Sequence, residues 1–105
     1  MTHSAAVVGN SSSGLYEAPS FSVPTVNIGS RQDGRARAAS VFDVAAKTAE
    51  ILTAVQKAIA WEKHPTANPY GDGKAVTRML SVLQGINDFK KLTAKSFHDH
   101  GPSYV

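Results

Sequence analysis

The feature that most constrains the fold is a short apolar run that ends in a turn rich in glycine and serine. Ala5-Ala6-Val7-Val8 carries no polar side chain, and Gly9-Asn10-Ser11-Ser12-Ser13-Gly14 follows it directly. A continuous apolar run predicts a strand covered on both faces, as in a parallel sheet. Residues 15–18 are expected to open a short helix, which Pro19 limits because an interior proline removes a backbone donor. This order is typical of an α/β domain.

The rest of the chain continues the same pattern. Strands are expected over residues 24–28 and 40–44, separated by a basic loop at 29–39. Two helices follow, one from about 46 to 61 and one after a loop at 64–74, because apolar residues recur at helical spacing. Their inner faces are expected to be Ile51, Leu52, Val55, Ala58 and Ile59 in the first helix, and Val76, Met79, Leu80, Leu83 and Ile86 in the second.

Three short strands make a narrow sheet with two exposed edges. Their unpaired backbone groups would favour aggregation if this were a complete domain. We therefore expect further strands upstream. Residues 1–88 are interpreted as the C-terminal part of a Rossmann-like domain, and residues 89–105 as a tail that extends the helix or is disordered.

Composition excludes several classes of protein. The 105 residues allow one small domain, and 42% of them are hydrophobic, which is enough for a core. The chain has no cysteine, so disulfides and thiolate metal sites are excluded, which fits a cytoplasmic location. No membrane span or signal peptide is expected, because no apolar stretch approaches about 20 residues. The net charge of +3 is dispersed, and its one cluster (Arg31, Arg35 and Arg37) lacks interleaved aromatic residues, so no nucleic-acid binding is expected.

The serine-rich turn is the strongest candidate for a binding site. The N-terminus of a helix presents unpaired N–H groups and a partial positive charge, both of which favour phosphate. Ser11, Ser12 and Ser13 add hydroxyl donors, and Gly14 allows close approach of the backbone to a ligand. Plain helix capping is the alternative, although one serine would be sufficient for it. From the residues alone, both interpretations stay open.

Three charged residues near this turn are further candidates. Glu17 lies too far from the serines for a capping box, so its carboxylate is free to accept hydrogen bonds from vicinal hydroxyls such as those of a ribose. Arg31 and Arg35 lie in the loop after the second strand, where a guanidinium can bind a phosphate. The alternative for all three is an ordinary solvated side chain.

Other polar residues are weaker candidates for a functional site. His98-Asp99-His100 is short of ligands for a metal site, and no metal or cofactor is expected. Asp43 at a strand end fits a helix cap better than a catalytic acid. No convincing acid/base set is present in the sequence.

Two segments resemble a known family. The first is Gly9-Asn10-Ser11-Ser12-Ser13-Gly14-Leu15-Tyr16-Glu17-Ala18-Pro19-Ser20-Phe21, continuing through residues 24–29 to Arg31-Gln32-Asp33-Gly34-Arg35, and the second is Asn68-Pro69-Tyr70-Gly71-Asp72-Gly73-Lys74-Ala75. In this order they resemble the C-terminal portion of hydrolysing UDP-N-acetylglucosamine (UDP-GlcNAc) 2-epimerases, enzymes of sialic acid biosynthesis. The resemblance covers residues 5–87.

The resemblance implies a fold like that of the GT-B glycosyltransferases, with UDP bound mainly on the C-terminal half. It implies that Ser11, Ser12, Ser13 and Gly14 hold the diphosphate, that Glu17 binds the ribose, and that Arg31 and Arg35 lie near the nucleotide. The family converts UDP-GlcNAc to N-acetylmannosamine and UDP.

The proton-transfer groups of the family lie in regions that this sequence lacks. We therefore expect the chain to be inactive alone, with a missing N-terminal domain or a homo-oligomer as partner. The alternatives are a fragment of a GT-B glycosyltransferase and a non-catalytic remnant that associates through its exposed sheet edges.

Overall fold

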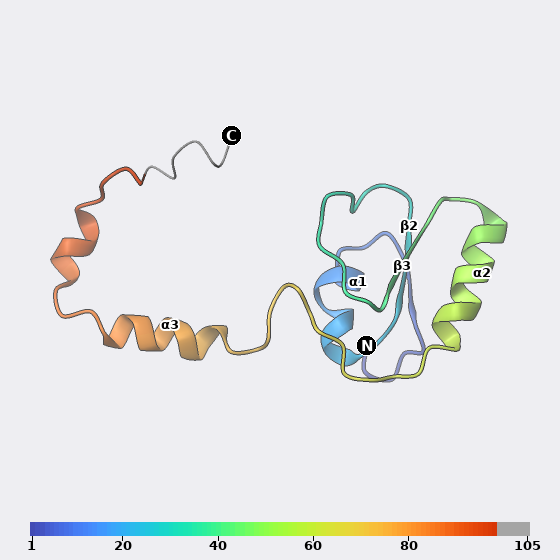
Figure 1. The fold of residues 1–105 in the computed structure, drawn as a ribbon, viewed down its shortest axis with the longest axis horizontal. Helices are drawn as coiled ribbons and strands as arrows, with labels where there is room; N and C mark the ends of the chain where they lie inside the picture. Colours follow the sequence, from blue (N-terminus) through green and yellow to red (C-terminus); the bar gives the residue numbers. More distant parts are fainter. Residues whose placement is uncertain (99–105) are drawn as a thin grey trace. The chain divides into compact units, whose positions relative to one another are not determined.

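The structure is a computed structural model that describes residues 1–98. It divides into two units, which are described separately: the first is Met1–Gly73 and the second begins at Lys74 (Figure 1). Residues 99–105 of the predicted tail, which include Asp99 and His100, lie outside the described residues.

The first unit is built around a parallel sheet. Its elements are, in chain order, β1 (Val7–Gly9), α1 (Ser13–Tyr16), the 3-10 helix η1 (Ala18–Phe21), β2 (Thr25–Ile28), β3 (Val41–Val44) and α2 (Thr48–Ile59). The strands pair in the order β1-β2-β3, with Val7 opposite Thr25 and Thr25 opposite Val41. The predicted α/β class is therefore confirmed, and the arrangement fits part of a Rossmann-like domain.

One face of the sheet is covered by α2, which contacts β2 and β3. Ala54 and Ala58 are buried against Val26, because their small side chains let the helix approach the sheet closely. The predicted inner face of this helix is partly wrong, since Leu52 is 58% and Ile59 is 64% exposed. Periodicity locates the apolar stripe, but a narrow sheet buries only the part of that stripe that lies over it.

The opposite face of the sheet carries α1 and η1, so that α1 and α2 lie on opposite sides of it (Figure 1). Leu15, Ala18 and Val23 are completely buried. Val8 of β1, in contrast, is 51% exposed. The prediction that this strand is covered on both faces is wrong, because β1 is an edge strand and α2 lies over β2 and β3.

The second unit contains α3 (Ala75–Gln84) and the 3-10 helix η2 (Phe89–Thr93). The predicted inner face of α3 is not buried in the described chain: no residue of this helix is buried, and Met79 is 64% exposed. Ile86 lies beyond the helix and is half-buried. An amphipathic period shows where an apolar stripe lies, but the partner that covers it must come from elsewhere. Within residues 1–98, no helix has the length and apolar character needed to cross a bilayer.

Candidate functional site

The loops that follow β1 and β2 meet at one edge of the sheet, because parallel strands all end on the same side. Gln32 joins these two loops and is only 1% exposed. Its Nε2 donates a hydrogen bond to the carbonyl of Asn10 at 2.7 Å, and its Oε1 accepts one from Nη1 of Arg35 at 2.7 Å. The serine-rich turn and Arg35 are thus linked through one buried side chain.

Tyr16 and Tyr70 form an aromatic pair that contacts Arg35. The guanidinium carbon of Arg35 lies 5.3 Å from the ring centre of Tyr16, within the range of a cation–π contact. Tyr16 in turn meets Tyr70 edge to face, with 4.2 Å between ring centres. The hydroxyl of Tyr70 donates to the carbonyl of Ala36 at 2.9 Å, and Nδ2 of Asn68 donates to the carbonyl of Tyr16 at 2.8 Å. The two segments that carry the family resemblance therefore contact each other.

The serine-rich turn does not cap α1 in the usual way. Ser12 occupies the N-cap position, but its side chain makes no capping hydrogen bond. The amide of Ser13 lies 3.4 Å from Oγ of Ser11, and the amide of Gly14 donates to the Ser11 carbonyl at 3.2 Å. In the described part of the chain, the amides of Ser11 and Ser12 are not bonded to any protein acceptor. Two amides and the Ser12 hydroxyl are thus available to an anion, and the binding of an anion there stays a prediction.

Gly14 has a packing reason to be glycine. A Cβ atom at this position would lie 2.5 Å from Cγ2 of Thr25, and Oγ1 of Thr25 donates to the Gly14 carbonyl at 2.9 Å. The contact between α1 and β2 therefore depends on the missing side chain. The predicted role of Gly14 in holding a diphosphate is a separate matter and stays a prediction.

Glu17 and Arg31 are exposed, and neither side chain makes a hydrogen bond or ion pair within residues 1–98. Of the charged residues predicted for the site, Arg35 is the one that protein contacts hold in place. The predicted roles of Glu17 and Arg31 are not tested by these contacts.

Sequence reasoning missed a polar network that crosses β2 and β3. Nδ2 of Asn27 donates to Oδ1 of Asp43 at 2.6 Å, and Nε of Arg37 donates to Oδ2 of Asp43 at 2.9 Å. The prediction of Asp43 as a helix cap is wrong, because this residue lies inside β3 and α2 begins only at Thr48, after Lys47. The sequence shows a basic cluster that includes Arg37, but no local pattern pairs this residue with Asp43.

These contacts change the proton affinity of both charged partners. Burial raises the pKa of Asp43, but hydrogen bonds from Arg37 and Asn27 and the charge of Arg37 outweigh it, so the pKa lies below its ordinary value of 3.8. The hydrogen bond to Asp43 raises the pKa of Arg37. Both groups are therefore held in their charged forms.

The lowered pKa of Asp43 predicts a pH dependence of stability. A carboxyl group with a depressed folded-state pKa stabilises the fold above its unfolded pKa and loses that contribution as pH falls through the folded value. We expect the difference in unfolding free energy between wild type and Asp43→Asn to be constant above about pH 5 and to shrink below about pH 4. Urea denaturation at several pH values measures it. An equal difference at about pH 3 and about pH 6 would contradict the assignment.

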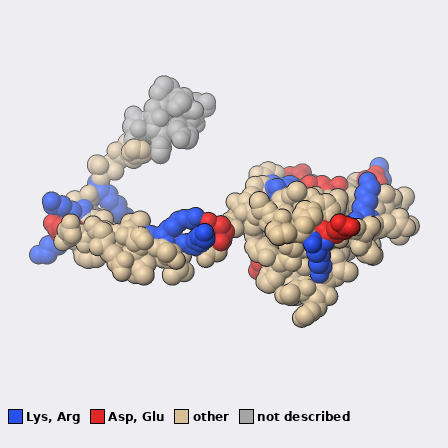
Figure 2. Space-filling model, turned by 60° about the horizontal axis from the view of Figure 1, so that its bottom comes forward, with Lys and Arg blue, Asp and Glu red and all other residues tan. Residues whose placement is uncertain are grey.

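Basic and acidic side chains lie side by side on the face of the first unit drawn in Figure 2. Nη2 of Arg37 is 3.6 Å from Oδ1 of Asp33, and Nζ of Lys47 is 3.4 Å from Oε1 of Glu50. These ion pairs compensate part of the basic excess of the sequence.

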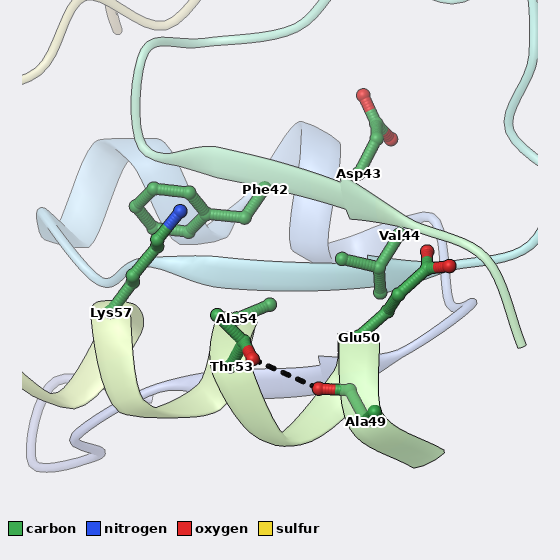
Figure 3. A pocket seen from close by; sticks show the side chains of 8 residues that line it. All are labelled: Phe42, Asp43, Val44, Ala49, Glu50, Thr53, Ala54 and Lys57. Atoms are coloured by element: carbon green, nitrogen blue, oxygen red, sulfur yellow. Dashed lines mark hydrogen bonds between the residues drawn. The ribbon is translucent and has the colours of Figure 1, made fainter. Parts of the chain in front are cut away.

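A hollow of about 500 Å³ lies between β3 and α2 (Figure 3). Phe42 and Val44 point toward the helix, whereas Asp43 points away from it. The partners of Asp43 are Asn27 and Arg37. The hydroxyl of Thr53 donates to the Ala49 carbonyl at 2.9 Å. The charged residues of the lining are Asp43, Glu50 and Lys57. No residue of the serine-rich turn or of the loop at 29–39 lines it, so this hollow is separate from the predicted site.

Comparisons with known proteins agree with the two matching segments. Residues 1–84 match the family described as UDP-N-acetylglucosamine 2-epimerase. A UDP-N,N'-diacetylbacillosamine 2-epimerase (hydrolyzing) of Legionella pneumophila is 42% identical over 82% of this chain and 23% of its own length. Polysialic acid biosynthesis protein P7 of Escherichia coli is 36% identical over 92% of this chain and 26% of its own length. A UDP-N-acetylglucosamine 2-epimerase of Neisseria meningitidis is 31% identical over 84% of this chain and 23% of its own length.

The chain spans about a quarter of the length of these relatives, between 23% and 26% of each. The match nevertheless includes the whole first unit and all of α3. The resemblance noted in the sequence is confirmed, and the chain belongs to the UDP-N-acetylglucosamine 2-epimerase family.

Proposed function

We propose that the first unit binds the UDP portion of a UDP-sugar, as the nucleotide segment of a hydrolysing UDP-GlcNAc 2-epimerase with a GT-B-like fold. The observation that carries the proposal is the Gln32 bridge, which joins the serine-rich turn to Arg35 at the carboxyl edge of a parallel sheet. Ligands of open α/β sheets bind at this edge. The names of two relatives also specify 2-epimerases of UDP-linked sugars.

Each candidate residue has a chemical role in this proposal. The free amides of Ser11 and Ser12 and the serine hydroxyls, including that of Ser13, donate to the diphosphate beside Gly14. Arg35 contributes charge near the nucleotide, and exposed Arg31 supplements it. The exposed carboxylate of Glu17 accepts hydrogen bonds from the ribose hydroxyls.

The complete reaction needs proton-transfer groups in addition to a nucleotide site. Because the relatives are about four times as long as their match to this chain, we propose that an N-terminal domain or a second copy supplies those groups. The chain tested alone then binds UDP without converting UDP-GlcNAc. The absence of cysteine supports the cytoplasm as the place where it acts.

Calorimetric titration with UDP tests the proposed site. We expect wild type to bind, and we expect Ser12→Ala and Glu17→Ala each to raise the Kd about five- to tenfold, because each loses hydrogen bonds to a charged or polyhydroxyl group. The N-cap side chain of Ser12 makes no capping bond, so Ser12→Ala should leave the unfolding midpoint unchanged.

The matched controls carry the same chemical changes elsewhere in the first unit. Ser4→Ala alters a serine that precedes β1, at the other edge of the sheet, and Glu62→Ala alters an exposed carboxylate beyond the end of α2. Both should bind UDP like wild type. A folded sample that gives no heat with UDP would refute the nucleotide site and favour a non-catalytic remnant.

A further inference from the structure

We propose that Arg37 is a positioning residue that holds Gln32 and Arg35 in place by fastening their backbone to Asp43 of β3 and, through Asp43, to the central strand β2. The inference rests on the proposed nucleotide function for its purpose, but its structural content is independent of any ligand.

The guanidinium of Arg37 forms hydrogen bonds both to the loop at 29–39 and to the sheet. Nη1 of Arg37 donates to the carbonyl of Gln32 at 2.8 Å and also to the carbonyl of Arg35. Nε and Nη2 donate to the carboxylate of Asp43 at 2.9 Å and 3.2 Å. The carboxylate is also bonded to Asn27, which is 1% exposed in β2. The carbonyls of Gln32 and Arg35 are thus tied to Asp43 of β3 and, through Asp43, to the buried Asn27 of the central strand.

The loop at 29–39 needs contacts of this kind to hold its conformation. It contains no helix or strand, and both Gly29 and Gly34 have φ of 78°, a conformation that glycine adopts easily. A site on such a loop binds more tightly when protein contacts order the loop beforehand. Fixing the backbone of Gln32 fixes both bonds of its side chain, to Asn10 and to Arg35.

Arg37 itself is not placed to bind a ligand. All three nitrogens of its guanidinium donate to protein acceptors, and its side chain is 22% exposed. Arg31 shows the opposite pattern, since it is exposed and makes no hydrogen bond or ion pair in the part of the chain that is described. Arg37 therefore acts through its neighbours.

Hydrogen exchange and UDP titration on the full chain test the proposal together. We expect Arg37→Ala to speed amide exchange within residues 29–39 about tenfold, to change exchange in β1 and β2 by less than about twofold, and to weaken UDP binding about three- to tenfold. Arg37→Lys keeps the charge beside Asp43, but an ammonium lacks the planar fork that serves a carboxylate and two carbonyls together. We expect amide exchange within residues 29–39 to be as fast in Arg37→Lys as in Arg37→Ala.

Two further variants separate positioning from binding and from charge. Arg31→Ala should weaken UDP binding without changing exchange in the loop. Lys57→Ala removes the same charge from α2 and should change neither quantity.

Unchanged exchange within residues 29–39 in Arg37→Ala would overturn the proposal. An equal acceleration throughout β2 and β3 would also overturn it, because that result indicates a general contribution to stability. If wild type does not bind UDP, the proposed function fails, but the exchange measurements still decide whether Arg37 positions the loop.

Discussion

Replacing Gly14 by alanine is expected to lower the unfolding free energy of the first unit by about 1–3 kcal/mol. The new Cβ would lie 2.5 Å from Cγ2 of Thr25, which is 2% exposed on the central strand and has little room to move. Alanine is the better helix former by about 0.5–1 kcal/mol, so α1 alone would favour the substitution. The steric clash is the larger effect, and urea denaturation of the two proteins measures the balance.

A double-mutant cycle isolates this clash. Thr25→Ser removes the Cγ2 methyl group and keeps the hydroxyl that donates to the Gly14 carbonyl. In the Thr25→Ser background, Gly14→Ala should cost much less than in wild type. Gly85→Ala is a control for the chemical change, because its Cβ would lie in ordinary contact distance, 3.5 Å from the Val82 carbonyl oxygen. Equal costs in both Thr25 backgrounds would show that the clash is not the cause.

Replacing Gln32 by methionine is expected to reduce both stability and the proposed nucleotide affinity. Methionine has a similar shape but cannot make the bonds to Asn10 and Arg35, and Gln32 is 1% exposed. Loss of these bonds should cost about 1–3 kcal/mol of unfolding free energy. Release of Arg35 and of the serine-rich turn should raise the Kd for UDP about tenfold. Thermal unfolding and calorimetric titration measure the two effects.

Gln32→Glu separates the two bonds of this bridge. A carboxylate still accepts from Arg35 but cannot donate to the carbonyl of Asn10. We expect Arg35 to stay in place while the link to the serine-rich turn is lost, with a Kd between those of wild type and Gln32→Met. If Gln32→Met unfolds and binds UDP like wild type, the bridge has no role in the site.

Local patterns in the sequence predicted the elements of this protein well. The apolar run before Gly9, the periodic residues of α2 and the position of Pro19 lead to the observed order of parallel strands and helices, with boundaries shifted by a few residues. The family could also be identified from sequence, because the resemblance lies in two segments, within residues 9–35 and at residues 68–75, whose residues are close together along the chain. Such features depend on neighbouring residues, whose conformational preferences act without the rest of the fold.

Tertiary structure alone decided which of these residues meet. Gln32 bonds to Asn10 across 22 positions, and Asn68 bonds to Tyr16 across 52. Such pairs depend on how strands and loops pack, which no local period encodes. The same holds for burial: the stripe of α2 was visible in the sequence, but the width and order of the sheet left Leu52 and Ile59 in solvent and brought Ala54 into the core. The hydrogen bonds of the candidate site, at the carboxyl ends of the strands, therefore depend on the tertiary fold. They need atoms at set distances that only packing provides.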